Sequence, residues 1–116
     1  MTTRKKIGDQ GEDNAVNFLF ANGYEVLERN YRLGRGEIDI IALKDSVMVF
    51  IEVKSRKNII YGYPETFLSE QQQDRIHLAA EEYVLQQAWQ GEVRFDIIAI
   101  LWEGKDPTLD HFEDAF

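Results

Sequence analysis

The sequence has 116 residues, of which 44% are hydrophobic, and this length and composition suit one compact domain rather than two. Its 13 basic and 21 acidic residues give a net charge of −8, whereas nucleic-acid-binding domains are usually basic. The absence of cysteine excludes disulfides and thiolate metal sites. Polar residues follow the basic start, and no apolar run approaches the ~20 residues that cross a bilayer. We therefore expect a cytoplasmic protein with no membrane partner.

The charges are unevenly distributed. Residues 29–57 contain seven basic and four acidic side chains, while acidic residues concentrate at 65–82 and 103–114. A locally basic stretch on an acidic protein can contact phosphate, although with little long-range attraction. A solvated charged surface is the alternative reading of the same pattern.

The first third of the chain predicts a helix, a strand and a loop. Apolar residues recur at helical spacing from Ile7 to about Ala21, and Asn22-Gly23 is typical of a helix end. Tyr24–Arg29 then has the composition of a short strand. The glycines in Asn30–Gly36 favour a loop.

A hairpin is predicted next. Ile38–Leu43 and Val47–Ser55 are rich in β-branched and apolar residues, and Lys44-Asp45-Ser46 separates them as a short turn. The remaining predicted elements are a connection (Asn58–Pro64), a second helix (about Glu70–Trp89, ended by Gly91), a buried strand (Arg94–Leu101), a turn (Asp106-Pro107) and a last edge strand (Leu109–Phe112).

This order, α-β-β-β-α-β-(β), predicts an α/β fold. Its first three strands would form an antiparallel meander, and the crossover through the second helix would make the third and fourth strands parallel. We expect a mixed sheet flanked by helices, as a single domain over residues 1–116.

The hairpin carries the most informative polar residues. Residues two apart in a strand share a face, so Glu52 and Lys54 project together, and on the partner strand Glu37 and Asp39 do the same. Asp is disfavoured inside strands, which makes Asp39 unusual. If the two faces coincide, three carboxylates and one ammonium converge near one end of the hairpin.

Such a cluster suits metal-assisted hydrolysis of a phosphodiester. Mg²⁺ prefers oxygen ligands and is typically held by one or two carboxylates with water and substrate phosphate. Asp39 and Glu52 would supply the carboxylates, and the carbonyl of Val53 a third oxygen. Lys54 would orient a water or stabilise charge on the phosphate. The alternative for Glu52 and Lys54 is an ion pair on a solvated strand.

Four residues are secondary candidates. Glu12 lies on the helical stripe predicted to face the sheet and could join the metal site, or it could be an acidic residue favoured near a helix N-terminus. Gln72 could enter the site from the second helix, but Ser69-x-x-Gln72 is also a capping box, which we prefer. Arg56 is an accessory candidate, as are Glu37 and Gln72.

Outside the hairpin, we interpret Asp96 as the structural partner of a basic residue. The two histidines, His77 and His111, have no cysteine or second histidine at ligand spacing, and we treat both as ordinary.

Several motifs together resemble the YraN family of uncharacterised bacterial proteins, which is uncharacterised protein family 0102. The resemblance covers nearly the whole chain and rests on these segments: Gly11-Glu12, Gly23-Tyr24, Asn30-Tyr31-Arg32, Gly36 to Ala42 (GEIDIIA), Phe50 to Arg56 (FIEVKSR), Arg94-Phe95-Asp96 and Ala115-Phe116. That family is similar to Holliday-junction resolvases and restriction endonucleases of the PD-(D/E)xK superfamily. One departure is Gln72, where the resemblance would suggest a lysine.

The resemblance implies a restriction-endonuclease-like fold with Asp39, Glu52 and Lys54 in catalytic positions and Glu12 as a helical acid. We therefore expect an endonuclease that uses Mg²⁺, or Mn²⁺, on DNA, including branched DNA, and we keep a homodimer open as its assembly. The rivals are a catalytically silent nucleic-acid-binding or scaffold protein and a hydrolase of small phosphodiesters, which would better suit the acidic surface.

Overall fold

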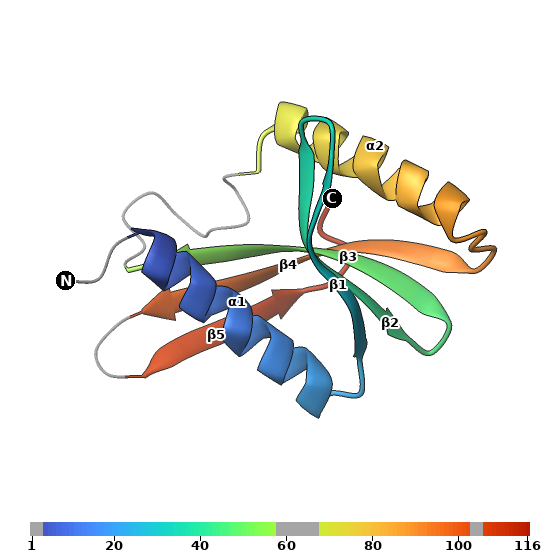
Figure 1. The fold of residues 1–116 in the computed structure, drawn as a ribbon. Helices are drawn as coiled ribbons and strands as arrows, with labels where there is room; N and C mark the ends of the chain where they lie inside the picture. The colour runs from blue at the N-terminus through green and yellow to red at the C-terminus, as the bar shows by residue number, and fades with distance from the viewer. Residues whose placement is uncertain (1–3, 58–67, 103–105) are drawn as a thin grey trace.

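The computed structural model describes residues 4–57, 68–102 and 106–116, with only the backbone for residues 4–9. The elements in chain order are α1 (Arg4–Ala21), β1 (Glu25–Leu33), β2 (Gly36–Lys44), β3 (Val47–Arg56), α2 (Glu70–Gln86), β4 (Glu92–Trp102) and β5 (Pro107–Phe112) (Figure 1). The five strands form one sheet in the order β1-β2-β3-β4-β5. Strands β3 and β4 are parallel and the other neighbours antiparallel, which confirms the predicted mixed sheet.

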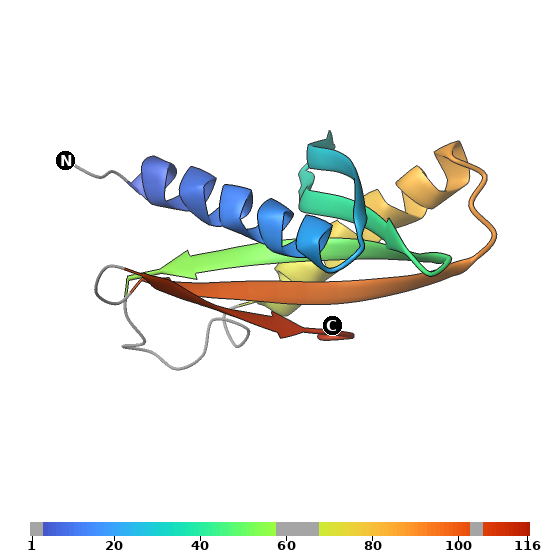
Figure 2. The same ribbon diagram turned by 90° about the horizontal axis from the view of Figure 1, so that it is seen from below.

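The two helices cover opposite faces of this sheet. Apolar side chains on one face pack with Ala15 and Leu19 of α1, and we call this cluster the α1-side core: Ile40, Ala42, Val49, Ile51, Ile98 and Ile100. Those on the other face pack with Ile76 and Tyr83 of α2, and we call this cluster the α2-side core: Ile38, Ile41, Met48, Phe50 and Ile97. Figure 2 shows α1 lying along its face of the sheet.

Local sequence signals produce two of the chain reversals. At the end of α1, Gly23 adopts a positive φ of 85°, and the amide of Tyr24 donates to the carbonyl of Leu19 at 2.9 Å, as expected for a glycine-terminated helix. Between β2 and β3, Asp45 and Ser46 both have positive φ, 50° and 63°, which fits a two-residue hairpin turn. Both predicted reversals are confirmed.

The predicted loop at Asn30–Gly36 is wrong. Strand β1 continues to Leu33, and only the short turn at Gly34-Arg35 separates it from β2. Tyr31 holds this part of the chain extended, because it pairs with Ile38 and its ring meets Tyr83 edge-on at 5.0 Å. Packing against α2 therefore outweighs the local turn-forming tendency of these residues.

The second helix also ends earlier than predicted, at Gln86 rather than Trp89. Ala88 has a positive φ of 50°, and the amide of Trp89 donates back to the carbonyl of Val84 at 3.0 Å. Gly91 is therefore not the helix stop. The predicted connection Asn58–Pro64 lies outside the described residues.

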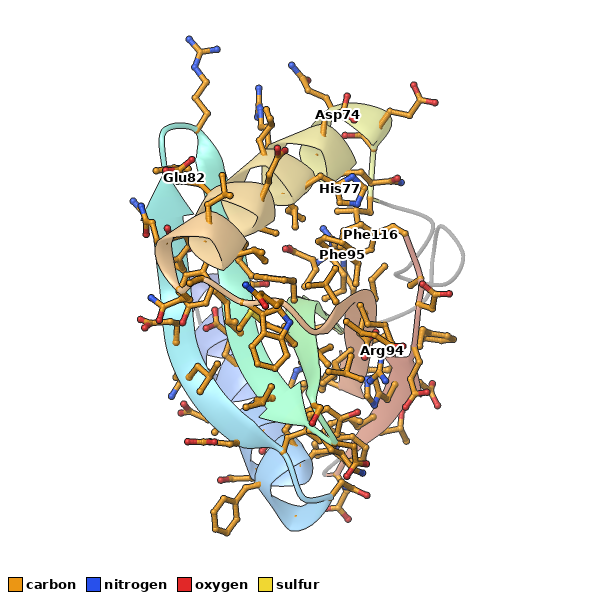
Figure 3. The ribbon with its side chains drawn as sticks, turned by 90° about the vertical axis from the view of Figure 1, so that its right-hand side faces the viewer. Asp74, His77, Glu82, Arg94, Phe95 and Phe116 are labelled. Atoms are coloured by element: carbon orange, nitrogen blue, oxygen red, sulfur yellow. The ribbon has the colours of Figure 1, made fainter. Side chains whose placement is uncertain are left out.

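The C-terminal residues return to the α2 side of the sheet. The amide of Ala115 donates to the carbonyl of Phe95 at 2.7 Å, and the ring of Phe116 stacks on His77 at 5.6 Å between centroids. His77 in turn meets Phe95 edge-on at 4.5 Å. Figure 3 shows these three rings gathered beside α2. His77 is thus part of an aromatic contact that fastens the tail.

Candidate functional site

The site begins where β2 separates from β3. The ladder between these strands runs from Lys44 opposite Val47 to Ile40 opposite Ile51, and beyond it the carboxylate of Asp39 accepts a hydrogen bond from the amide of Val53 at 2.8 Å. A side chain thus occupies the place that a strand carbonyl would take in a continued ladder. The separation lets Asp39 point between the two strands toward the α2 side.

Asp39 and Glu52 form a partly buried carboxyl pair. Burial raises the pKa of Glu52 to about 8, and the charge of Asp39 adds to this shift. Burial also raises the pKa of Asp39, although the amide of Val53 and the Glu52 side chain oppose the rise by donating hydrogen bonds to it. Near neutral pH the pair therefore holds a shared proton.

Lys54 is the buried cation beside this pair. It is 8% exposed, and its Nζ lies 3.8 Å from Oε1 of Glu52. The ion pair weighed as the alternative to a site is therefore present, but it is buried rather than solvated. Charged groups that are shielded from solvent and lie close together, as this lysine and the two carboxyl groups do, cluster at functional sites.

A pocket of about 180 Å³ opens over the pair. The lining comes from the β1–β2 turn, β2, β3 and the first two turns of α2: Arg35, Glu37, Asp39, Glu52, Gln72, Arg75 and Ile76. Figure 1 shows the tip of the β1–β2 hairpin beside α2. Helix α2 thus closes one side of a pocket that contains three carboxyl and two guanidinium groups.

Gln72 has both of the roles considered for it. Its side-chain oxygen accepts from the amide of Ser69 at 3.0 Å, while the hydroxyl of Ser69 accepts from the amide of Gln72 at 3.1 Å, so the capping box is confirmed. The same side chain also lines the pocket.

The other candidates lie at the edge of this arrangement or away from it. Glu12 is on α1, which covers the opposite face of the sheet; its carboxylate is 3.9 Å from Arg29, and it does not line the pocket. Arg56 is exposed, and its guanidinium donates to the carbonyl of Ser55 at 3.0 Å. Val53 contacts the site through its amide, whereas a role for its carbonyl stays a prediction.

The carboxyl groups of this site suit a hard divalent cation that takes only a few of its ligands from the protein. Among the residues whose positions are described, no three Asp, Glu or His side chains form a group that could hold one ion. Asp39 and Glu52 provide two carboxyl groups, which is the number that Mg²⁺ sites commonly use when waters and substrate oxygens complete the shell. A cation would replace the shared proton and relieve the repulsion between the two groups.

A second buried polar cluster lies on the α1 side. Asp96 is fully buried and accepts hydrogen bonds from Arg94, from Nε2 of His111 at 2.7 Å and from the amide of Asp114 at 3.0 Å. Burial raises the pKa of Asp96, but these three donors outweigh it and hold the pKa below its usual value. Arg94 also donates to the hydroxyl of Tyr24 at 2.8 Å.

This cluster confirms the predicted basic partner of Asp96 and corrects the treatment of His111 as an ordinary residue. The sequence offered no local signal for the contact, because His111 comes from β5 and reaches Asp96 through the register of that strand against β4. Because its carboxylate accepts from three different residues, Asp96 is a structural anchor that fastens β5 and the tail to the sheet.

No helix in the described parts of the chain has the length and apolar character needed to span a bilayer.

Comparison with known proteins places the chain in a family. Residues 11–100, which include Asp39, Glu52 and Lys54, match the model of uncharacterised protein family UPF0102. A UPF0102 protein of Flavobacterium psychrophilum is 41% identical over 116 residues, covering 100% of this chain and 98% of the relative. Relatives from Cytophaga hutchinsonii and Dictyoglomus turgidum are 46% and 45% identical, covering 83% and 97% of this chain and 85% and 98% of theirs. The protein is thus a member of the uncharacterised family UPF0102, to which the sequence motifs pointed.

Proposed function

We propose that this protein is a metal-dependent endonuclease that hydrolyses phosphodiester bonds in structured DNA, with Mg²⁺ or Mn²⁺ as its cofactor. The observation that carries the proposal is the partly buried pair of Asp39 and Glu52, which lines a pocket and has the buried Lys54 beside it. Converging buried charges cost stability, so a protein that keeps them needs a function for them. A solvated ion pair would not require this burial.

Asp39 and Glu52 would hold the cation. The amide of Val53 fixes the Asp39 carboxylate by its 2.8 Å hydrogen bond, so that one ligand is oriented before any substrate arrives. When bound, the metal would polarise the phosphate and lower the pKa of a water.

Lys54 acts on the phosphate. Its ammonium group is held within 3.8 Å of Glu52 and is almost fully shielded from solvent, where its charge is weakly screened. In hydrolysis a water oxygen bonds to phosphorus while the bond to the leaving oxygen breaks, and negative charge grows on the phosphoryl oxygens. The lysine would stabilise that charge or orient the water.

The rival function is a nucleic-acid-binding scaffold that has no activity. The net charge of −8 favours it, since an acidic surface weakens encounter with DNA. Activity and binding must therefore be measured separately on the same DNA.

Replacing Lys54 distinguishes the nuclease from the nucleic-acid-binding scaffold. We expect wild type to cleave branched, flapped or single-stranded DNA with Mg²⁺ or Mn²⁺ at low salt, and Lys54→Ala to cleave roughly 10²-fold more slowly or worse. Binding of the same DNA should change much less, because one phosphate contact carries only part of the affinity. Rates come from gel assays and affinities from fluorescence anisotropy.

Three controls accompany this comparison. Lys54→Met keeps the length of the side chain without its charge, so it tests the charge if Lys54→Ala unfolds. Lys44→Ala removes a lysine at the other end of β2, whose Nζ lies over the ring of Tyr24 at 5.0 Å, and should leave cleavage unchanged. Calorimetric titration with Mn²⁺ should lose its binding signal in Asp39→Asn. Binding of DNA by wild type with no cleavage under any condition would reject the nuclease in favour of the scaffold.

A further inference from the structure

Two arginines line the pocket that contains Asp39 and Glu52, and of these Arg35 is exposed and Arg75 is half-buried. Arg35 belongs to the turn between β1 and β2, and Arg75 to the second turn of α2, and both line the pocket. Within the described part of the chain, neither has an ion-pair partner. The neighbouring Arg32, by contrast, pairs with Glu37 at 3.7 Å and Arg94 pairs with Asp96 at 2.9 Å. Two arginines are thus free to bind an anion at an otherwise acidic pocket.

The elements that carry these arginines are packed directly against each other. A Cβ atom at Gly36 would lie 2.6 Å from the carbonyl oxygen of Arg75 and 3.1 Å from Cβ of Ala79. The glycine therefore allows the hairpin tip to touch the helix backbone, which sets the distance between the two arginines. Their spacing is a property of the fold and not of two independent mobile loops.

The size of the pocket limits what it can enclose. Sites that surround small ligands are commonly about 300–1,000 Å³, whereas this pocket measures about 180 Å³. A nucleotide would not fit inside, but one phosphate group of a longer chain would. The rest of such a chain would lie outside the pocket, within reach of the exposed Arg35 and the half-buried Arg75.

We propose that Arg35 and Arg75 bind the phosphates next to the one that enters the pocket, so that the substrate is a continuous nucleic-acid strand rather than a mononucleotide or a small phosphodiester. This inference rests on the proposed function and adds the residues that hold the substrate strand on either side of the reacting phosphate. Arginine suits the role because its planar group binds phosphate through two parallel hydrogen bonds.

Arg75 also supplies the positive charge that Gln72 lacks. The side-chain oxygen of Gln72 is engaged with the amide of Ser69, and its amide group carries no charge. Arg75 follows three residues later, so both side chains lie on the same side of the helix. The cation of α2 at this pocket is therefore one helical turn further along than the capping residue.

Binding is the first test, measured by fluorescence anisotropy of a labelled oligonucleotide over a range of salt concentrations in an Asp39→Asn background. Arg35→Gln and Arg75→Gln should each weaken binding about tenfold at low salt, since a charge-assisted hydrogen bond is lost. Each should also reduce the salt slope by about one. Lys44→Gln makes the same change in net charge at the far end of β2 and should do neither. Mn²⁺ binding by the two arginine variants in the wild-type background should match that of wild type.

The second test compares substrates with one phosphate and with many. Bis(4-nitrophenyl) phosphate has no neighbouring phosphates, so each arginine variant should lose much less kcat/KM on it than on an oligonucleotide, for which KM should rise. Equal losses on both substrates would overturn the inference, since the arginines would then act at the reacting phosphate. Where the small diester is not turned over, the comparison of strand binding with Lys44→Gln decides.

The outcomes separate this inference from the function on which it rests. If wild type cleaves DNA and the arginine variants bind strands as Lys44→Gln does, the arginine contacts are wrong and the nuclease stands. If wild type hydrolyses only the small diester, the strand substrate is wrong. If wild type neither binds nor cleaves any strand, the proposed function and this inference both fail.

Discussion

Asp39 and Glu52 illustrate how two residues can be unfavourable for folding and still be well positioned. Their neighbours on the α2 side, Phe50 and Ile41, are fully buried, so the carboxyl groups lie at the end of an apolar surface with little water. The hydrogen bond from Val53 and the charge of Lys54 offset only part of the cost of burial. The retained proton offsets a further part, and a cation could take its place.

This proton predicts how stability depends on pH. The pKa of Glu52 rises from 4.5 in the unfolded chain to about 8 in the folded protein, so the folded state holds the extra proton between these values. Its contribution to stability is therefore fully present below about pH 4.5 and is lost as pH rises toward 8, with a slope of up to about 1.4 kcal/mol per pH unit from this one proton. The raised pKa of Asp39 changes stability in the same direction. Asp96, whose pKa is lowered, titrates below this window.

Glu52→Gln removes the titrating group while keeping a similar shape. In metal-free buffer with chelator, its free energy of unfolding should fall less than that of wild type between pH 5 and 8, and should exceed that of wild type at pH 8. Urea unfolding at both pH values measures this difference. Identical pH dependence in the two proteins would mean that Glu52 ionises normally in the fold.

At the scale of elements, the contact between the hairpin tip and α2 determines whether the pocket exists. Gly36 allows this contact, because a side chain there would meet the backbone of Arg75, which cannot rotate away. Gly34, two residues earlier, has a positive φ of 57°, and a Cβ atom added there would meet no other atom within 4 Å. The two glycines therefore serve different purposes: one permits a turn, and the other permits packing.

Replacing each by alanine should separate these purposes. Gly34→Ala should cost roughly 1–2 kcal/mol through backbone strain alone, and Gly36→Ala about 1–3 kcal/mol through overpacking. Only Gly36→Ala should also weaken strand binding per folded molecule, because it moves Arg75 away from Arg35. Urea unfolding and anisotropy give the two quantities. Equal strand binding by both variants would mean that the spacing of the arginines is unimportant.

Elements with a strong local pattern could be predicted from the sequence. Both strands of the β2–β3 hairpin, its turn at Asp45-Ser46 and the capping box at Ser69 follow from short-range rules and are confirmed. The stretch from Asn30 to Gly36 could not be predicted, because its strand depends on Tyr31 meeting the ring of Tyr83, which comes from α2, far along the chain. Local composition contains no information about that contact.

The site shows the same division. The alternation of strand residues was enough to bring Glu52 and Lys54 to one face, and their ion pair confirms it. The position of Asp39 depends on where β2 leaves β3, and that of Arg75 on how α2 crosses the sheet. Both are set by tertiary packing, so Arg75 was missed entirely and Asp39 was a hypothesis about register.

At the scale of the whole molecule, the two faces of the sheet carry polar clusters with different roles. On the α1 side, Asp96 collects donors from β4, β5 and the tail and makes a fully satisfied structural cluster. On the α2 side, the carboxyl pair keeps a proton and faces a pocket. The protein that carries both clusters has a net charge of −8. The arginines at the pocket would therefore act at short range, and salt should weaken strand binding through these few contacts.

The hydrogen bond from Val53 to Asp39 has a spectroscopic consequence. A backbone amide whose acceptor is a proposed metal ligand should change its ¹H–¹⁵N resonance when a cation replaces the proton that the carboxyl pair shares, and ¹⁵N-enriched protein reports this without any added chemical probe. The amide of Asp114, which donates to Asp96 at 3.0 Å, is a matched reference because its carboxylate acceptor belongs to the structural cluster. Titration with Mg²⁺ should move the Val53 cross-peak and leave that of Asp114 in place. If both peaks stay fixed while Mg²⁺ rises to millimolar concentrations, the Asp39 carboxylate holds no ion, and the nuclease loses its cofactor before any DNA has been added.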